Sequence, residues 1–348
     1  MINYGIIGCG GIARRRAIPA MSECSHSKLV AVMDVNPDAV REVAADTGTK
    51  GYMTEAELLA DPNVQAVYIA TPVFLHKDQV IAAAKADKHI LVEKAIAVDV
   101  SEAEEMIAAC KAAGVYLTEG YMMKFHSLHQ KAAQMVHNGD IGNVVFARAQ
   151  LSCWYPDIPG AWRQDPAKGG GGALIDMASH CYDLLQHIVG SKISEVVAFT
   201  NTLTFKYPVE DSSTTLLRFE SGAHAVVDAF FNVPDAAGQD RLEIYGNKGS
   251  IQAEGTISQV PAGKMVAYLS DSAGDYDPQQ SKTGLDVTIR QIGGTPVNMY
   301  AAQMDYLSNC IEKSTPPAIN TGEEGLRILK IVKAAYKSNS TGCKVIVE

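Results

Sequence analysis

The first 120 residues alternate short apolar runs with candidate helices. Polar or turn-forming residues bound the apolar runs, as is typical of strands buried on both faces of a parallel sheet. These runs lie at residues 4–8, 28–34, 66–71, 89–94 and 115–120. The candidate helices lie at 12–21, 37–47, 54–60, 76–86 and 101–113. Two of them begin with the S/T-x-x-E pattern of a capping box, at Thr54 and Ser101. This alternation predicts a doubly wound parallel sheet.

Beyond residue 120 the pattern changes, and we place a domain boundary there, between 1–120 and 121–348. After a candidate helix at 129–138 and a strand at 144–154, successive strands are expected at 195–205, 212–220, 222–231, 241–246 and 264–269. Turns rich in glycine separate them, which favours a large, open, mostly antiparallel sheet with helices on one side. A region rich in Gly, Ser, Asp and Pro follows at 271–296. The last helices, from about residue 299, are expected at 299–313 and 322–338 and can pack back on the first domain.

Composition narrows the class of protein. The net charge of −9 argues against binding of nucleic acid or of an anionic membrane, since both require a basic surface. The chain contains no apolar stretch of the roughly 20 residues that a membrane span needs, and its N-terminal residues lack the pattern of a secretory signal. Its seven cysteines are scattered and form no C-x-x-C pair, as expected for reduced thiols. We therefore expect a cytoplasmic protein.

The first apolar run leads into GCGGIA at 8–13, which matches the G-x-G-x-x-G/A pattern of Rossmann dinucleotide-binding domains. Gly8 permits a tight turn, Gly10 lets a pyrophosphate approach the backbone, and Ala13 lets helix and strand pack closely. The start of the helix offers N–H groups to the phosphates. The residues expected to contact the cofactor here are Gly8, Cys9, Gly10, Gly11 and Ile12.

Asp34 closes the second apolar run, where a carboxylate can bind the adenosine ribose and repel a 2′-phosphate. This favours NAD over NADP. A nearby guanidinium would accommodate the phosphate, so Arg14, Arg15 and Arg16 are evidence on the other side. They lie on the first helix, and we interpret them mainly as a solvated face.

Polar residues follow two further predicted strands at the edge where open α/β sheets bind ligands. Thr71 and Pro72 end one strand, with His76 just beyond, and Glu93 and Lys94 end the next. The alternative for Glu93 and Lys94 is a surface ion pair of little energetic value. The alternative for His76 is a polar residue at the start of a helix.

A third candidate region, GGGGALIDMASHCYDLL at 169–185, joins four glycines to a helix. Apolar residues define one face of this helix. Polar residues recur on another face at spacings of four, three and four: Asp176, His180, Asp183 and His187. This second face can be solvated or can form the wall of a site. Together with the H-x-x-H sequence at 126–129 it raises the question of a metal, but no specific ligand signature is matched and we expect none.

These motifs, in this order, resemble the glucose–fructose oxidoreductase / inositol dehydrogenase / rhizopine-catabolism (Gfo/Idh/MocA) family over nearly the full length. The resemblance rests on the nucleotide turn at 8–13, the T-P…H sequence at 71–76, the E-K pair at 93–94, EGYMMKFH at 119–126, GGGALIDMASHCYDLL at 170–185 and the segment 298–342. Two positions depart from the family pattern, since Ala95 and Ser127 stand where proline is common.

The resemblance implies that Lys94, Asp176 and His180 meet at the nicotinamide and the reacting carbon. Histidine titrates near neutral pH, so His180 is favoured as the acid/base for hydride transfer at a secondary alcohol. Lys94 would stabilise the developing alkoxide, and Asp176 would line the substrate. An exchange of roles between His180 and Lys94 stays open. The four glycines are expected to let the chain pass close to substrate and nicotinamide.

Aromatic and polar residues near these motifs suit a polyhydroxylated ligand. The residues expected to bind substrate are Lys94, Lys124, Trp154, Trp162, Arg163, Asp176 and His180. Each tryptophan has the alternative of a place in the core.

The predicted function is an NAD(H)-dependent oxidoreductase acting on a sugar, polyol or keto-sugar. The alternatives are a redox-neutral lyase, epimerase or glycosidase with bound NAD, and a non-catalytic sensor of nucleotide or sugar. A homodimer or homotetramer formed through the C-terminal sheet is expected by the same resemblance.

Overall fold

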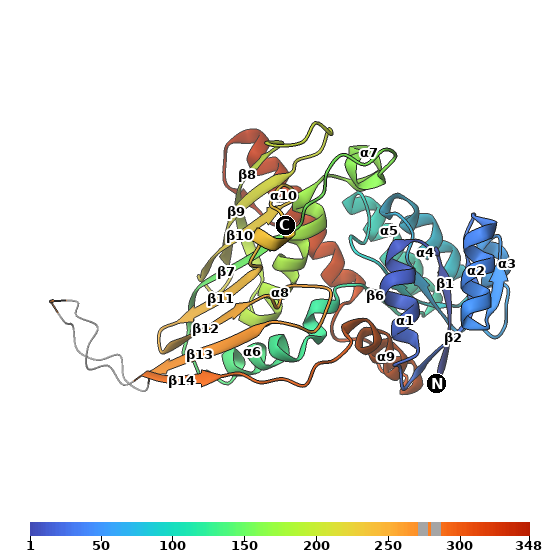
Figure 1. The fold of residues 1–348 in the computed structure, drawn as a ribbon, viewed down its shortest axis with the longest axis horizontal. Helices are drawn as coiled ribbons and strands as arrows, with labels where there is room; N and C mark the ends of the chain where they lie inside the picture. The colour runs from blue at the N-terminus through green and yellow to red at the C-terminus, as the bar shows by residue number, and fades with distance from the viewer. Residues whose placement is uncertain (271–277, 280–286) are drawn as a thin grey trace. The chain divides into compact units, whose positions relative to one another are not determined.

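The computed structural model describes residues 1–270, 278–279 and 287–348 (Figure 1). Contacts divide the chain into two compact units. The first unit comprises Met1–Met122, Gly160–Gly171 and Asn298–Leu329, and the second comprises Met123–Pro159, Gly172–Val297 and Lys330–Glu348. The expected Gly-, Ser-, Asp- and Pro-rich region at 271–296 lies partly outside the described residues.

The first unit is built on a parallel sheet of six strands in the order β3-β2-β1-β4-β5-β6. The strands are β1 Ile2–Ile7, β2 Ser27–Met33, β3 Lys50–Tyr52, β4 Ala66–Ile69, β5 His89–Val92 and β6 Leu117–Glu119. All five pairings are parallel, so the predicted doubly wound sheet is confirmed. The short edge strand β3, of which only one residue is even partly buried, was not predicted because it lacks an apolar run.

The first unit also contains helices and helical turns. They are η1 Ala13–Ala17, α1 Ile18–Met21, α2 Pro37–Thr47, α3 Glu55–Leu59, η2 Val73–Leu75, α4 His76–Lys85, α5 Val100–Ala113, η4 Trp162–Gln164, α7 Pro166–Gly169 and α9 Met299–Glu312. The capping box at Thr54 is confirmed. The one expected at Ser101 is wrong, because the N-cap of α5 is Asp99, two residues earlier, and Glu102 accepts from its N–H at 3.4 Å.

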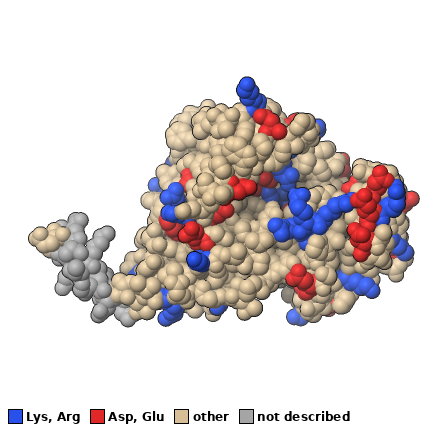
Figure 2. All heavy atoms as spheres, viewed as in Figure 1, with Lys and Arg blue, Asp and Glu red and all other residues tan. Residues whose placement is uncertain are grey.

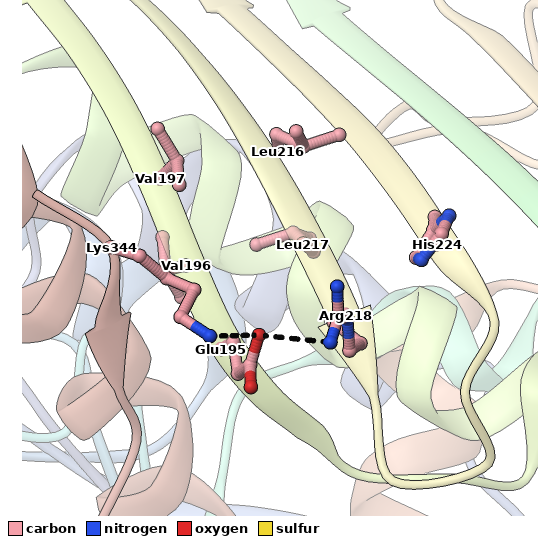
Figure 3. Close-up of a pocket in the computed structure, with 8 residues that line it drawn as sticks. All are labelled: Glu195, Val196, Val197, Leu216, Leu217, Arg218, His224 and Lys344. Carbon is pink, nitrogen blue, oxygen red and sulfur yellow. Dashed lines mark ion pairs between the residues drawn. The ribbon is translucent and has the colours of Figure 1, made fainter.

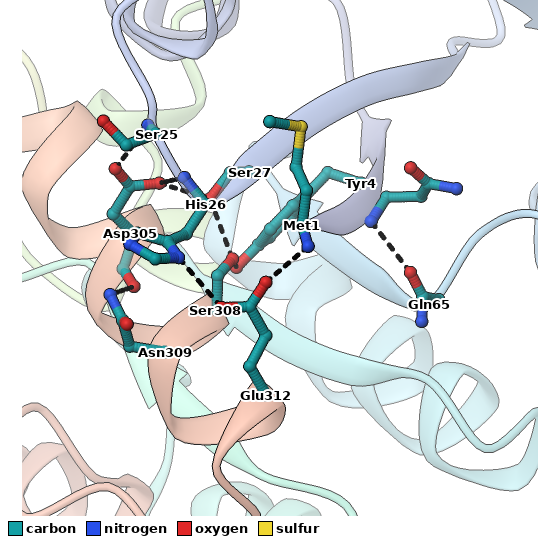
Figure 4. A network of polar contacts seen from close by, with 11 residues as sticks. Met1, Tyr4, Ser25, His26, Ser27, Gln65, Asp305, Ser308, Asn309 and Glu312 are labelled. Carbon is teal, nitrogen blue, oxygen red and sulfur yellow. Dashed lines mark hydrogen bonds and ion pairs between the residues drawn. The ribbon is translucent and has the colours of Figure 1, made fainter.

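Helix α9 is tied to the first two strands of the sheet by a polar network (Figure 4). The carboxylate of Asp305 accepts hydrogen bonds from the N–H of Ser25 at 2.7 Å and of His26 at 2.9 Å, and from the hydroxyl of Ser27 at 2.9 Å. Further along the helix, Glu312 pairs with the N-terminal amine and with the ring of His26. These contacts place a C-terminal segment in the first unit.

The second unit is built on a sheet of nine strands in the order β14-β13-β12-β11-β7-β10-β9-β8-β15. The strands are β7 Val144–Ser152, β8 Ile193–Asn201, β9 Ser212–Phe219, β10 His224–Phe230, β11 Arg241–Gly246, β12 Gly249–Glu254, β13 Lys264–Ser270, β14 Val287–Gln291 and β15 Val345–Ile346. Among the described strands of this second sheet, only the pairing of β7 with β10 is parallel, which confirms the mostly antiparallel sheet.

Helices cover one face of this second sheet (Figure 1). The π-helical turn η5 Leu174–Ala178 and α8 Ser179–Val189 pack on the sheet, and α6 Ser127–His137 packs on α8. The unit also contains η3 Met122–Phe125 at its start, η6 Asp235–Ala237 and the later part of α10 Gly322–Thr341. Along β9 the side chains alternate between buried and exposed, so the opposite face of the sheet is open.

Acidic and basic side chains lie close to one another over the face shown in Figure 2, in keeping with the modest net charge of −9. Among the described residues, no helix is both long and apolar enough to cross a membrane.

Candidate functional site

The glycine turn after β1 is formed by backbone geometry that only glycine tolerates well. Gly8 has φ +97°, and a Cβ there would lie 2.9 Å from the Cγ2 atom of Thr71. Its N–H donates to the carbonyl of Met33 at 2.8 Å. A Cβ on Gly10 would meet nothing within 4 Å, and the N–H of Arg14 donates to the Gly10 carbonyl as the helix begins. The backbone at Gly10 therefore faces open space, as the approach of a pyrophosphate requires.

Asp34 lies beside this turn and is held by two backbone donors. The N–H of Cys9 donates to one carboxylate oxygen at 2.7 Å, and the N–H of Asn36 donates to the other at 2.9 Å. Each oxygen keeps acceptor capacity for a ribose hydroxyl. Arg14 contacts the protein itself, since its Nε donates to the Cys9 carbonyl at 3.0 Å and its Nη1 pairs with Glu42 at 2.8 Å. The geometry thus fits an adenosine ribose without a 2′-phosphate.

The remaining residues of the turn, Cys9, Gly11 and Ile12, are also compatible with binding of the dinucleotide. Burial, and then the charge of Asp34, raise the pKa of the Cys9 thiol to about 11, so the thiol stays protonated at neutral pH. Gly11 and Ile12 form the first helical residues, and a Cβ on Gly11 would lie 2.7 Å from the guanidinium of Arg15. The side chain of Arg15 therefore folds over the start of the helix.

His76 connects the loops that follow β4 and β5. It is buried; its Nε2 lies 3.0 Å from the carbonyl oxygen of Thr71, and its Nδ1 lies 3.0 Å from that of Ala95. Burial lowers the pKa of the ring, although the carbonyl contacts oppose this. Pro72 is the N-cap of η2, and the peptide bond between Lys94 and Ala95 is cis. His76 thus links the two backbone loops at the expected cofactor edge, the loop after β4 and the loop after β5.

Glu93 is buried beneath the same edge. The hydroxyl of Tyr68 donates to one of its oxygens, and the N–H of Lys94 lies 3.3 Å from the other. A Cβ on Gly120 would lie 3.3 Å from the carboxylate, so the backbone there packs closely against Glu93. Burial raises the pKa of Glu93, partly offset by the hydrogen bond from Tyr68. A surface ion pair, the alternative considered for Glu93 and Lys94, does not describe this arrangement.

Trp162 and Arg163 belong to the first unit. The guanidinium of Arg163 lies 4.1 Å from the centroid of the Trp162 ring, a cation–π contact. The following helix α7 packs against η2, and the charge of Arg163 lies close enough to help lower the pKa of Glu93. This loop therefore lies at the same sheet edge as Thr71 and Lys94.

The second unit carries the other predicted residues on one helical segment. Asp176 lies in the π-helical turn η5, and His180 lies in the first turn of α8 and is buried. One turn further, Asp183 is buried and pairs with Nζ of Lys124 at 2.8 Å, where both side chains are 3% exposed. This polar stripe is therefore not a solvated face. π-Helical turns of this kind recur at functional sites.

Two buried histidines support the turn that carries Lys124. Nδ1 of His129 lies 2.9 Å from the carbonyl oxygen of Met123, and both ring nitrogens of His126 engage backbone groups. Burial lowers the pKa of His129 to about 3, which keeps the ring neutral. Among the residues that the structure describes, no group of three or more His, Cys, Asp or Glu side chains could hold a metal.

Trp154 lies in the second unit, whereas Trp162 lies in the first. It is 43% exposed and contacts Phe205 edge to face, with ring centroids 5.1 Å apart. Phe205 in turn stacks on Tyr207. Trp154 is therefore not a core tryptophan, which was the alternative considered for it.

Sequence reasoning missed Glu210, which contacts the start of the helix that carries Asp176. Its carboxylate accepts the N–H of Gly172 at 3.0 Å and of Leu174 at 2.9 Å. A Cβ on Gly172 would lie 2.0 Å from the Glu210 carbonyl oxygen. Of the four glycines, at least Gly172 is therefore required by the close approach of the Glu210 backbone. An acidic residue in a connection between strands carries no motif, so no signal in the sequence identified it.

The open face of the nine-stranded sheet holds a shallow pocket outside the predicted site (Figure 3). Leu216 lies at its floor and is 53% exposed. Glu195 lies at its rim, 3.0 Å from Nζ of Lys344 and 3.5 Å from Nη1 of Arg218. The pocket combines an apolar floor with a charged edge.

Comparison with known proteins agrees with this architecture. A model described as the oxidoreductase family with NAD-binding Rossmann fold matches residues 2–121, and one for the GFO/IDH/MocA C-terminal domain matches residues 129–252. A 1,5-anhydro-D-fructose reductase from Ensifer adhaerens is 29% identical over 100% of this chain and 99% of its own. A myo-inositol 2-dehydrogenase from Thermotoga maritima is 29% identical over 97% and 96%. The crystal structure of aldose-aldose oxidoreductase from Caulobacter crescentus has a TM-score of 0.88 at 30% identity, covering 99% of each chain. The chain belongs to the Gfo/Idh/MocA family and is an oxidoreductase with an NAD-binding Rossmann domain.

Proposed function

We propose that the protein transfers hydride between NAD(H) and a secondary alcohol or ketone carbon of a sugar or polyol. The observation that carries the proposal is the carboxylate of Asp34 beside the glycine turn, oriented by the N–H of Cys9 at 2.7 Å as an acceptor for the ribose of NAD. The family motifs supply the proposed reactive residues Lys94, Asp176 and His180. The relatives named for anhydrofructose, inositol and aldose substrates support this class of substrate.

The cofactor half of the site lies in the first unit. N–H groups at the start of the helix, from Gly8 to Ile12, would bind the pyrophosphate, and Asp34 would accept the ribose hydroxyls. Thr71, Pro72 and Lys94 would line the nicotinamide end. His76 and Glu93 would hold these loops in place from beneath, because their polar atoms already engage the protein.

The bound nicotinamide supplies or accepts the hydride. His180 removes the hydroxyl proton during oxidation and returns it during reduction. Lys94 stabilises the negative charge that develops on the same oxygen. Asp176 accepts a hydrogen bond from the substrate and fixes its orientation.

The residues proposed to bind the remainder of the substrate differ in surroundings. Trp162 and Arg163 offer an aromatic surface with a cationic edge, which suits a polyol. Trp154 offers a second exposed ring. Lys124 contributes through its buried pair with Asp183, which supports the helix that carries His180.

The test is a screen of sugars, inositols and keto-sugars with NAD(H) and NADP(H), followed at the nicotinamide absorbance. Lys94→Ala and His180→Ala should each lower kcat by about 10²–10⁴-fold, the usual contribution of a positioned acid or base. The exposed Lys85→Ala serves as the matched control. Turnover at the wild-type rate in both site variants would refute the assignment. Substrate conversion without net change in absorbance would instead identify the redox-neutral alternative.

We further propose that the protein is a cytoplasmic homo-oligomer that pairs through the open face of the second sheet. Its seven cysteines are all free, which suits a reducing compartment. Phe199 and Leu216 on that face are 72% and 53% exposed. Leu216→Asp should shift the mass measured by light scattering to that of a smaller species, and cell fractionation tests the location.

A further inference from the structure

Glu210 occupies the start of the helical segment that carries Asp176 and His180. Its two carboxylate oxygens each lie 3.0 Å from the N of Gly172, and one of them also accepts the N–H of Leu174 at 2.9 Å. The N–H of Ala173 donates to the main-chain carbonyl of Glu210 at 3.0 Å. Three successive N–H groups that have no partner inside a helix are therefore satisfied by one residue.

Glu210 is itself held from two sides. The hydroxyl of Tyr336, on α10, donates to the same carboxylate at 2.8 Å. The neighbouring Asp211 is fully buried and accepts the N–H groups of Leu203 and Thr204, both at 2.8 Å. The connection between β8 and β9 is thereby pinned where Glu210 leaves it. The helix start rests on a rigid support.

The backbones also approach as closely as they can. A Cβ on Gly172 would lie 2.0 Å from the carbonyl oxygen of Glu210, so only glycine fits. Burial raises the pKa of Glu210, and the hydrogen bonds from Leu174 and Tyr336 oppose this shift. The donors around it are those that an ionised carboxylate requires.

The segment that follows is sensitive to its start. Residues Leu174–Ala178 form a π-helical turn, a conformation with weaker intrinsic stability than the α-helix. Asp176 lies within this turn, its N–H bonded to the Gly172 carbonyl at 3.0 Å, and His180 follows as the second residue of α8. The direction of both side chains thus depends on where the first turn is anchored.

We propose that Glu210, supported by Tyr336, is a positioning residue for Asp176 and His180. The proposal rests on the proposed function, in which these two side chains serve the substrate. Glu210 acts through the helix start and does not touch the reacting atoms. Its loss leaves cofactor binding intact and lowers the rate of the chemical step.

The experiment compares Glu210→Gln, Tyr336→Phe and the matched surface control Glu254→Gln, with kcat expressed per NADH-binding site. An amide keeps the shape of the carboxylate but presents an NH₂ group to a backbone N–H. We expect kcat to fall by about 10–100-fold in Glu210→Gln, since a displacement of about 1 Å in a catalytic group costs about 10²-fold. Tyr336→Phe should lower kcat by only a few-fold, because the carboxylate keeps its hydrogen bonds from the N–H groups of Gly172 and Leu174. The Kd for NADH should stay within about twofold throughout, because its proposed contacts lie in the first unit.

The outcomes separate the two proposals. A kcat per NADH-binding site equal to wild type in Glu210→Gln, with His180→Ala inactive, overturns the positioning role and leaves the proposed function standing. Full activity in His180→Ala overturns the proposed function itself. If Glu210→Gln does not fold, Tyr336→Phe decides: a lowered kcat with unchanged KM supports the proposal, and an unchanged kcat overturns it.

Discussion

Replacing Asp34 by alanine should weaken the binding of NADH and reduce the discrimination against NADPH. In the structure the carboxylate is oriented by the N–H groups of Cys9 and Asn36, at 2.7 Å and 2.9 Å. The substitution removes the acceptor for the ribose hydroxyls and leaves both N–H groups without this partner. It also removes the negative charge that would face a 2′-phosphate.

The expected changes in Kd follow from the lost hydrogen-bond acceptor and from the lost negative charge. A hydrogen bond to a charged group contributes about 1.5–3 kcal/mol, so the Kd for NADH should rise by about 10–150-fold. A phosphate of about two negative charges at about 5 Å from a carboxylate is repelled by about 2–3 kcal/mol at an effective dielectric constant of about 40–80. The ratio of the Kd for NADPH to that for NADH should therefore fall by at least about 100-fold in Asp34→Ala.

The assay is titration of each nucleotide by its fluorescence on binding, at one fixed ionic strength. The matched control is Asp38→Ala, which removes a carboxylate that is 71% exposed in the first turn of α2. The control should change either Kd by less than about twofold, since exposed charges are screened. A Kd for NADH within twofold of wild type in Asp34→Ala, or an unchanged nucleotide preference, would refute the reasoning.

Three further predictions concern buried polar groups. Lys124→Met leaves the buried carboxylate of Asp183 without its cation, so the free energy of unfolding in urea should fall by about 3–5 kcal/mol. Replacing both partners by apolar residues should recover most of this loss, and a single-variant loss below about 1 kcal/mol would contradict the account. His129 has its pKa lowered to about 3 from an ordinary 6.5, so between these pH values only the unfolded chain takes up the proton. Stability should therefore fall as the pH drops from 6.5 towards 3, by up to about 1.4 kcal/mol per pH unit, and His129→Gln should lack this component when the two urea series are compared. Burial raises the pKa of Glu93, and the hydrogen bond from Tyr68 partly offsets this by stabilising the ionised carboxylate. Tyr68→Phe removes that hydrogen bond. The folded protein then holds the ionised form of Glu93 less well, and this form predominates at high pH. Tyr68→Phe should therefore be destabilised more at pH 8 than at pH 5, and an equal loss of stability at both pH values would exclude this role of the hydrogen bond.

The sequence by itself determined the first sheet and the nucleotide turn, and in the second sheet it predicted every strand except β12, β14 and β15. Strand and helix follow from local periodicity of apolar side chains, and six parallel strands formed where the alternation predicted them, apart from the short β3. The turn at Gly8 is local as well, because a positive φ selects glycine whatever surrounds it. Asp34 could be identified as a candidate because its distance from that turn along the chain is set by one β–α–β unit.

Only the tertiary structure showed which partners the buried polar residues contact. In the sequence, Glu93 and His76 were candidates for contact with the cofactor, with a surface ion pair and a helix-start residue as the alternatives. In the structure their polar atoms contact Tyr68 and the protein's own backbone. Glu210 and Gly172 are 38 residues apart and meet through a connection whose path no local pattern specifies. The reason is physical: periodicity and turn chemistry act over a few residues, while the partner of a buried carboxylate is chosen by the packing of segments distant along the chain.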